Sequence, residues 1–212
     1  MREYGTYIFD LDNTIVDSSH GMEIAFKKAF AAFDMIYEPA RYNEYISTPL
    51  SETFARYHTG DNSGYKEFVS IVVKTYDDHF HESFSLFCDA EDVIRFLHSR
   101  GKKMGIVSNS ITRHINAILS HLGVRDMFGS IVGVDRCPSG KPDPCTVLLC
   151  LSELGSEKSD SLMTGDSEND VWAATRAGID AVHIDRRGDG AVYGKAATID
   201  DLRELLTPYR QS

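Results

Sequence analysis

The chain has 212 residues, of which 42% are hydrophobic, so it is long enough to bury a substantial core. Its length allows one large α/β domain or one domain that carries a smaller insert. The formal charge of −10 argues against a nucleic-acid-binding surface, because such surfaces present clustered lysine and arginine side chains. We therefore expect no nucleic-acid partner. A small anionic ligand remains compatible with this charge where a bound cation reverses the local field.

No apolar stretch has the length of a signal peptide or a membrane span, and residues 1–5 lead directly into a short apolar run. We expect a cytoplasmic protein with no membrane partner. The four cysteines form no C-x-x-C pair and show no zinc-type spacing, which favours buried reduced thiols. These residues are Cys88, Cys137, Cys145 and Cys150.

Short apolar runs that end in polar residues predict buried strands. They cover 6–9, 103–107, 130–134, 161–164 and 181–184. Between the second and third runs, apolar residues recur with helical spacing from Ile111 to Leu122 and stop before Gly123. Alternating strands and helices predict an α/β fold with helices on both faces of a parallel sheet. The ligand crevice of such a fold lies beyond the carboxyl ends of the strands.

Residues 18–85 interrupt this alternation, because they show helical periodicity and no convincing strand. Two apolar stripes with helical spacing give the longer predicted helices a face to pack. We therefore predict a division into two domains. Residues 1–17 and 86–212 form the core that contains the sheet, and residues 18–85 form an inserted all-helical domain.

The first predicted strand ends at two closely spaced carboxylates, Asp10 and Asp12, and Thr14 follows them. Neighbouring carboxylates repel, and each raises the pKa of the other unless a cation binds them. Such a site suits a hard divalent ion with oxygen ligands, and Mg2+ is the natural candidate. An aspartate in this position can attack phosphorus, while the neighbouring carboxyl group serves as general acid and then as general base.

Polar residues at three positions further along the chain could complete such a phosphoryl-transfer site. Ser108 and Asn109 follow the second strand and can donate hydrogen bonds to a phosphoryl oxygen. Lys141 lies between turn residues, where its ammonium group can offset charge on a nucleophile and a phosphoryl group. Asp166 and Asp170 follow the fourth strand and can complete a magnesium shell directly or through water.

Each of these residues also has a simpler explanation. The aspartates after the first strand can cap a helix or form a turn, and Ser108 and Asn109 can be turn formers. Asp170 can cap the helix that follows it, a role that is compatible with metal binding. The order of the four motifs along the chain favours the catalytic interpretation. We assign the charged, glycine-rich run at 186–190 to a solvated loop.

Together these motifs resemble those of the haloacid dehalogenase-like superfamily, and within it the phosphoglycolate phosphatase-like branch. The resemblance covers nearly the whole chain and includes Gly-Asp-Ser-x-x-Asp-Val from Gly165 to Val171, followed by Ala-Ala-x-x-Ala-Gly. It implies a Rossmann-like sheet and a helical cap inserted after the first motif, where residues 18–85 lie. Asn13 stands where the branch often has glycine, a change that removes no reacting group.

The resemblance also implies a role for each motif residue. Asp10 corresponds to the nucleophile and Asp12 to the general acid and base, and Lys141 completes the catalytic set. The phosphate-binding group comprises Thr14, Ser108, Asn109 and Lys141. The implied magnesium ligands are Asp10, the backbone carbonyl of Asp12, and Asp166, with Asp170 in support.

The predicted function is an Mg2+-dependent phosphatase that hydrolyses a small phosphorylated metabolite through an aspartyl-phosphate. A sugar phosphomutase on the same scaffold is an alternative, although Thr14 stands where the resemblance places valine in mutases. Haloacid dehalogenation is less favoured, because it has no leaving alkoxide for Asp12 to protonate. A catalytically silent binding or regulatory module is a further alternative. The inserted domain would act as a lid, and the protein would be a monomer or dimer.

Overall fold

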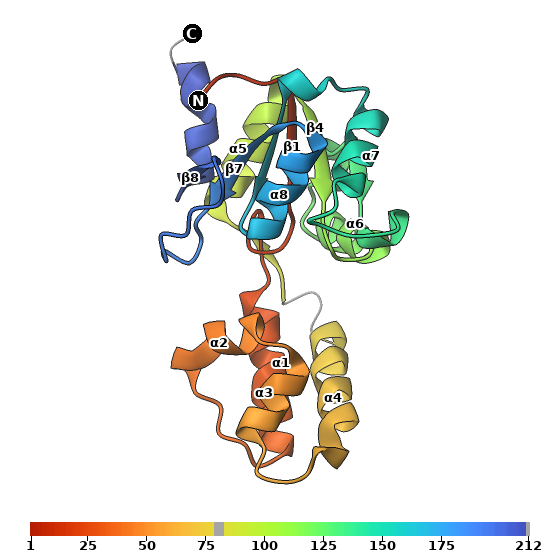
Figure 1. Cartoon of the computed structure of the whole chain (residues 1–212), viewed down its shortest axis with the longest axis vertical. Helices are drawn as coiled ribbons and strands as arrows, with labels where there is room; N and C mark the ends of the chain where they lie inside the picture. The colour runs from red at the N-terminus through yellow and green to blue at the C-terminus, as the bar shows by residue number, and fades with distance from the viewer. Residues whose placement is uncertain (79–82, 211–212) are drawn as a thin grey trace. The chain divides into compact units, whose positions relative to one another are not determined.

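The chain divides into two units in the computed structural model, which describes residues 1–78 and 83–210. One unit comprises Met1–Asp17 and Leu86–Ser212, and we call it the core. The other comprises Ser18–Ser85, and we call it the insert. Figure 1 shows that the core holds the large sheet and that the insert consists mainly of helices.

Six strands form the sheet of the core, in the order β5-β4-β1-β6-β7-β8, and each neighbouring pair is parallel. The strands are β1 (Thr6–Phe9), β4 (Lys103–Val107), β5 (Ser130–Val132), β6 (Ser161–Gly165), β7 (Asp180–Ile184) and β8 (Ala197–Ile199). All four residues of β1 are buried, as expected for a strand that helices cover on both faces. The predicted α/β fold with a parallel sheet is thus confirmed.

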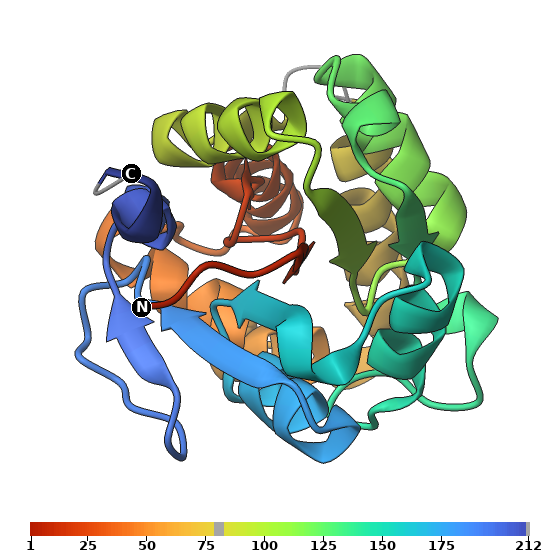
Figure 2. The ribbon, with the colours of Figure 1, turned by 90° about the horizontal axis from the view of Figure 1, so that it is seen from above.

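Helices cover both faces of this sheet (Figure 2). They are α5 (Cys88–Ser99), α6 (Thr112–His121), α7 (Cys145–Leu154), α8 (Glu168–Ala177) and the 3-10 helix η7 (Leu202–Arg210). Helices α7 and α8 pack against each other, and α5 contacts η7. Helices α5 and α6 lie in the connections that lead from β1 to β4 and from β4 to β5, in one direction along the sheet. Right-handed crossovers therefore place both helices on the same face. The crossovers through α7 and α8 run in the opposite direction along the sheet and therefore lie on the other face.

The core packs apolar side chains from the centre of the sheet against α7 and α8. Ile8, Val107 and Met163 are buried there against Val147 of α7 and Ala173 of α8. Full burial of side chains of this size contributes about 1.5–3 kcal/mol each. This packing holds the central strands in register, and the positions of their carboxyl ends follow from it.

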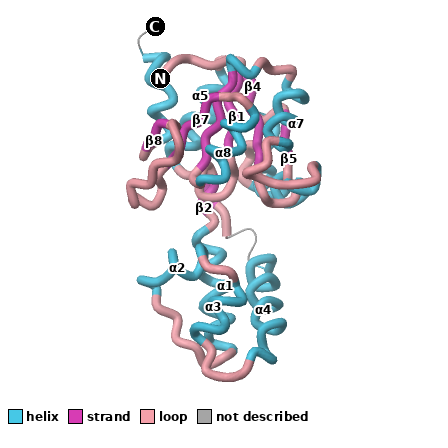
Figure 3. The backbone as a smooth tube through the Cα atoms, in the orientation of Figure 1, coloured by secondary structure: helices cyan, strands magenta, loops and turns pink. Residues whose placement is uncertain are grey.

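The described residues of the insert form four α-helices around an aromatic centre. The helices are α1 (Ser19–Ala32), α2 (Tyr42–Ser47), α3 (Leu50–Tyr57) and α4 (Tyr65–Asp78), with 3-10 turns η1 (Pro39–Arg41) and η2 (Asn62–Gly64). Phe30 is fully buried, and its ring lies 5.0 Å from that of Tyr45 and 6.2 Å from that of Phe68. Figure 3 shows helices and loops throughout the described residues from α1 to α4. A two-stranded sheet of β2 (Val16–Asp17) and β3 (Ser85–Leu86) lies where the two units join in the sequence.

Three sequence-based expectations differ from the structure. The third strand ends at Val132, because Val134 begins the 3-10 turn η5 (Val134–Arg136). Strand β8 was not predicted, since two of its three residues are exposed and give no apolar run. Cys137 and Cys145 form a disulfide, which corrects the expectation of buried reduced thiols. Cys150 is a buried free thiol as expected, whereas Cys88 is a free thiol that is exposed. The Cα atoms of Cys137 and Cys145 lie 6.1 Å apart, and no sequence pattern had indicated that they would be close.

Among the described residues, no helix combines the length and the apolar character that crossing a membrane requires.

Candidate active site

The candidate site lies at the carboxyl edge of the sheet, where three neighbouring strands end. Asp10 follows the central strand β1, and its backbone N–H donates to the carbonyl of Thr164 in β6 at 2.9 Å. Ser108 follows β4 and Asp166 follows β6. Because β4 and β6 both pair with β1, these residues meet although up to 156 positions separate them in sequence.

A cavity of about 370 Å³ opens at this edge. It is lined by Asp10, Asp12, Asn13, Ser108, Asn109, Ser110, Lys141, Asp166, Ser167, Asn169 and Arg187. The structure therefore brings six of the predicted site residues into one cavity, namely Asp10, Asp12, Ser108, Asn109, Lys141 and Asp166. The other two, Thr14 and Asp170, lie outside the cavity lining and are both buried.

Lys141 is the buried cation of the site, with 7% of its surface exposed. Its Nζ donates to Asp10 Oδ1, to Asp170 Oδ1 at 2.5 Å and to the carbonyl of Val107 at 3.1 Å. Burial alone would lower the pKa of this lysine, but the two carboxylates outweigh that effect and raise it. Lys141 therefore stays charged and neutralises part of the acidic cluster.

The carboxylates beside Lys141 are hard to ionise together. Burial raises the pKa of Asp10 well above its usual value, the charges of Asp170 and Asp166 raise it further, and Lys141 opposes this shift. Burial, followed by the charge of Asp170, raises the pKa of Asp166 to about 6. Oxygen atoms of these three aspartates lie within 4.8 Å of one another. A hard divalent cation fits this donor set, because it would stabilise the ionised form of all three.

Asp12 lies at the cavity with its side chain partly exposed. Ser110 Oγ donates to Asp12 Oδ2 at 3.3 Å. The turn that presents Asp12 requires Asn13 in the left-handed region, at φ 55°, and the N–H of Asn13 donates to the carbonyl of Val16 at 2.8 Å. Asparagine adopts this conformation more readily than most residues other than glycine. Asn13 can therefore form the same kind of turn as the glycine that is common in the resembling branch.

Asn109 holds the loop that carries Lys141. Its Oδ1 accepts the backbone N–H of Lys141 at 2.8 Å, and its Nδ2 donates to the carbonyl of Lys141 at 3.2 Å. The disulfide between Cys137 and Cys145 closes the same loop. Asn109 was predicted as a phosphate-binding residue, and the structure gives its amide a second task, the positioning of the lysine. Ser108 is buried at the cavity, and its Oγ accepts the N–H of Ser110 at 3.0 Å.

Thr14 lies behind Asp10, outside the lining of the cavity. Its side chain is fully buried, and its hydroxyl donates to Asp10 Oδ2 at 3.4 Å. In this position the hydroxyl supports the carboxylate, and the phosphate-binding role of Thr14 stays a prediction.

Asp170 combines a helix cap with a bond to the lysine. Its Oδ2 accepts the backbone N–H of Ser167 at 3.0 Å and the hydroxyl of Ser167 at 2.5 Å, while its Oδ1 bonds Lys141. The residue at 165 has to be glycine for this approach, since a Cβ there would lie 2.3 Å from Asp170 Cγ. The capping role that the sequence left open is therefore present beneath the cavity.

The run at 186–190 lies outside helices and strands and is exposed from Arg187 onward, as predicted, but its two arginines also make contacts that the prediction of a solvated loop did not include. Arg187 lines the cavity, with its guanidinium 3.8 Å from Asp166 Oδ2. Arg186 is largely buried and donates to Asp89 Oδ2 at 2.7 Å and to the carbonyl of Thr14 at 2.8 Å. The only sequence signal for them was their position directly after a predicted strand end, where functional side chains of α/β proteins gather.

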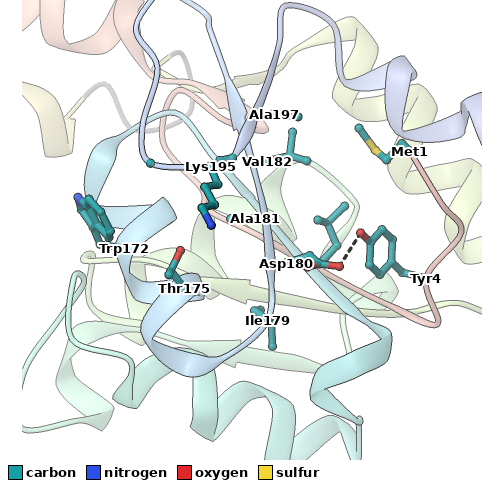
Figure 4. A pocket seen from close by; sticks show the side chains of 13 residues that line it. Met1, Tyr4, Trp172, Thr175, Ile179, Asp180, Ala181, Val182, Lys195 and Ala197 are labelled. Atoms are coloured by element: carbon teal, nitrogen blue, oxygen red, sulfur yellow. Dashed lines mark hydrogen bonds between the residues drawn. The ribbon is translucent and has the colours of Figure 1, made fainter.

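A larger cavity, of about 910 Å³, lies elsewhere in the core (Figure 4). Its lining includes Trp172 and Thr175 of α8, Lys195, and Asp180, whose carboxylate accepts the hydroxyl of Tyr4 at 2.9 Å. None of the predicted site residues line it. The chemistry that the sequence indicates therefore belongs to the smaller cavity.

Comparisons with known proteins agree with this geometry. The model of the haloacid dehalogenase-like hydrolase family matches residues 7–184. The chain is 28% identical to the phosphoglycolate phosphatase of Salmonella paratyphi A, over 91% of this chain and 84% of that protein. It is 23% identical to the pyrophosphatase PpaX of Oceanobacillus iheyensis, over 95% of each chain.

A solved structure shows the same fold. A candidate β-phosphoglucomutase from Thermotoga maritima superposes with a TM-score of 0.80 at 21% identity, covering 100% of this chain and 99% of that one. A likeness at this identity concerns the fold alone. The family match extends over most of the chain and includes the motifs at Asp10, Ser108, Lys141 and Asp166. The resemblance inferred from the motifs is confirmed, and the chain belongs to the haloacid dehalogenase-like hydrolase family.

Proposed function

We propose that this hydrolase is an Mg2+-dependent phosphatase that acts on a small phosphate monoester through a phosphoryl group on Asp10. The observation that carries the proposal is the buried Asp10 carboxylate, bonded to Lys141 and adjacent to Asp166 at the floor of a 370 Å³ cavity. Lys141 and a bound divalent cation would together keep this buried carboxylate ionised, and an ionised carboxylate can serve as a nucleophile. The relatives named as phosphoglycolate phosphatase and pyrophosphatase support phosphoryl transfer as the reaction class.

The donor set supports Mg2+ as the cofactor. Asp10 and Asp166 would supply carboxylate ligands, the backbone carbonyl of Asp12 a further one, and Asp170 would support them from beneath. The four aspartates of the site face two cationic side chains, Lys141 and Arg187, so added positive charge is needed before a phosphate can enter. When bound, Mg2+ supplies charge neutralisation for the phosphoryl oxygens and the carboxylates.

Asp10 would begin the reaction by attacking phosphorus. The new bond joins its carboxylate oxygen to phosphorus, and the bond from phosphorus to the ester oxygen breaks. Asp12, partly exposed at the cavity, would give its proton to that leaving oxygen, so that an alcohol departs. In the second step Asp12 takes a proton from water, the water oxygen attacks phosphorus, and inorganic phosphate leaves with Asp10 restored.

Groups around the cavity would stabilise the charge that spreads over the phosphoryl oxygens. Lys141 offsets charge on the nucleophile, and the Ser108 hydroxyl lies at the cavity wall. Preorganised donors of this kind supply a large part of catalysis in phosphoryl transfer. Thr14 and Asn109 would act indirectly, because their side chains support Asp10 and the Lys141 loop.

The substrate is proposed as a compact phosphorylated metabolite, and phosphoglycolate is the first compound to test. The test measures initial rates with Mg2+ over a panel of phosphoglycolate, ethyl phosphate, sugar phosphates, nucleotides and pyrophosphate, with EDTA as the blank. We expect release of inorganic phosphate that depends on Mg2+. A complete lack of hydrolysis over the panel would favour the silent binding module. Conversion of one sugar monophosphate isomer into another would favour the mutase.

A further inference from the structure

Arg187 is a cation at the cavity whose donors are largely free. Its side chain is 45% exposed, and the contact to Asp166 Oδ2 is a 3.8 Å ion pair, too long for a hydrogen bond. Among the described residues, its guanidinium has no hydrogen-bond partner, in contrast to Lys141, whose Nζ makes three hydrogen bonds. This ion pair joins the exposed side chain of Arg187 to the largely buried carboxylate of Asp166. Because the contact is longer than a hydrogen bond, the N–H donors of Arg187 stay available to a ligand in the cavity.

The backbone that carries Arg187 is fixed by Asp185. The carboxylate of Asp185 accepts four backbone N–H groups: those of Arg187 at 3.2 Å, Gly188 at 2.7 Å, Asp189 at 3.3 Å and Gly190 at 2.9 Å. These bonds lower the pKa of Asp185, with that from Gly190 the largest cause. The loop therefore closes around one charged side chain and presents Arg187 from a defined position.

Arg186 anchors the same loop from the other side. It donates to the buried Asp89 and to the carbonyl of Thr14, and its guanidinium lies over the ring of Phe87 at 4.0 Å from the centroid. Thr14 belongs to the turn that follows Asp10, so this anchor ties the Arg187 loop to the nucleophile segment. The loop that carries Arg187 is therefore anchored to the segment that follows Asp10.

The phosphoryl group does not account for Arg187. Lys141 and Ser108 already serve the end of the cavity at Asp10. The planar fork of an arginine pairs well with a carboxylate, through two parallel hydrogen bonds. A second phosphate would bring more negative charge than one arginine offsets beside four aspartates, whereas a carboxylate brings one charge. The cavity of about 370 Å³ has room for a compact ligand that reaches both Asp10 and Arg187.

We propose that Arg187 is a specificity-determining residue that binds a carboxylate on the leaving group of the substrate. The substrate class is then a short phosphate monoester of a hydroxy acid. This inference rests on the proposed phosphatase function and adds to it the residue that selects the leaving group. The hydroxy acid product would retain the carboxylate and leave after its ester oxygen is protonated.

The test compares two esters with the same two-carbon chain, phosphoglycolate and ethyl phosphate, in the full-length protein with Mg2+. For Arg187→Gln we expect the ratio of kcat/KM values, phosphoglycolate over ethyl phosphate, to fall about 10- to 100-fold, mainly through KM. Arg187→Lys keeps the positive charge but loses the two parallel donors of the guanidinium. Its ratio of kcat/KM values should lie between those of the wild type and Arg187→Gln. An unchanged ratio in Arg187→Gln, or an equal loss for both esters, would overturn the assignment.

The matched control is Arg95→Gln on α5. Arg95 is an exposed arginine paired with Glu91, and its loss changes the net charge of the chain by the same amount. The ratio should stay at the wild-type value in this variant, which separates a local contact from a general field effect. Absence of hydrolysis over the whole substrate panel by the wild type would overturn the proposed function and this inference together, whereas hydrolysis of other phosphate esters but not of phosphoglycolate would overturn this inference alone. Hydrolysis of both with an unchanged ratio in Arg187→Gln would overturn this inference alone.

Discussion

The core and the insert both carry exposed ion pairs, but among the described residues only the core also has buried ones. In the core, Lys141 is buried between Asp10 and Asp170, and Arg186 is largely buried against Asp89. In the described part of the insert, ion pairs join side chains that are about one-third or more exposed, such as Lys27 with Glu23 and Arg56 with Glu52. The interior of the insert is aromatic instead, with rings gathered around Phe30.

This difference reflects two tasks: the insert needs only stable packing, whereas the core also has to hold charged groups for a reaction. A buried ion pair gains little over well-packed apolar residues, because desolvation offsets the attraction between the charges. The insert follows the less costly arrangement, with apolar groups inside and charges outside. The core retains buried charge at the edge of the sheet where its reaction would occur. Buried charges are therefore better markers of the site in this chain than exposed ones.

The largest effect on stability is expected from Phe30→Ala in the insert. Phe30 is fully buried among aromatic rings, so truncation should lower the free energy of unfolding by about 3–5 kcal/mol. Val73→Ala in α4 is the matched control, because Val73 is 51% exposed. Urea unfolding followed by circular dichroism measures both. Equal midpoints for the two variants would contradict the aromatic core described above.

Arg186→Leu tests the buried pair of the core. Removal of the guanidinium leaves the Asp89 carboxylate buried without its partner, and we expect a loss of about 3 kcal/mol in the free energy of unfolding. The same urea titration on Arg56→Leu, in the exposed pairs of the insert, should give a much smaller shift of the midpoint. If the two variants lost the same stability, the contrast between the regions would not hold.

Low pH should weaken the ion pair between Arg186 and Asp89. Burial alone would raise the pKa of Asp89, but its bonds from Arg186, Leu202 and Ala90 outweigh this and hold the pKa below the usual value. A depressed pKa means stability that is present above the unfolded value near 3.8 and is lost as pH falls through the folded value. In Asp89→Asn the loss of stability between pH 5 and pH 3 should therefore be shallower than in the wild type, as followed by thermal unfolding.

The smallest effect is expected for Mg2+ on thermal stability. The pKa of Asp166 is raised to about 6, so this carboxylate destabilises the metal-free protein progressively as pH rises from about 3.8 to 6. Below about pH 6, protons compete with the ion for this carboxylate. The gain in Tm on adding Mg2+ should therefore be larger at pH 7.5 than at pH 5.0, by about 2 °C or more.

Asp166→Asn and Asp126→Asn separate the causes of that effect. Asp166→Asn removes a buried charge, so it should raise the Tm without metal and reduce the gain from Mg2+. Asp126 is exposed outside the site, and its variant should respond to Mg2+ as the wild type does. A gain in Tm that is equal at both pH values, or unchanged in Asp166→Asn, would speak against an ion at these carboxylates.

Strand ends explain why much of the site was predictable. The apolar runs at 6–9, 103–107 and 161–164 are strands, and parallel pairing brings the residues that follow them to one edge. Asp10, Ser108 and Asp166 could therefore be placed from sequence. Strand β8 could not be predicted, because exposure of Ala197 and Thr198 leaves no apolar pattern.

The remaining features depend on contacts between distant segments, which periodicity does not encode. Arg187 reaches the cavity from a loop that reads as polar and solvated. Thr14 lies behind Asp10 because the chain turns at Asn13, although the family resemblance implied a phosphate-binding role for it. The proximity of Cys137 and Cys145 follows from the path of the Lys141 loop, and it too required the structure.

The central claim is that Asp10 carries the phosphoryl group during turnover. Its most direct test is a rapid acid quench of the protein with Mg2+ and labelled phosphoglycolate or ethyl phosphate, followed by mapping of the labelled peptide. The account predicts label on Asp10 in the wild type, and none in Asp10→Asn, while Asp126→Asn is labelled as the wild type is. Turnover without label on Asp10, or label on another residue such as Ser108, would contradict it.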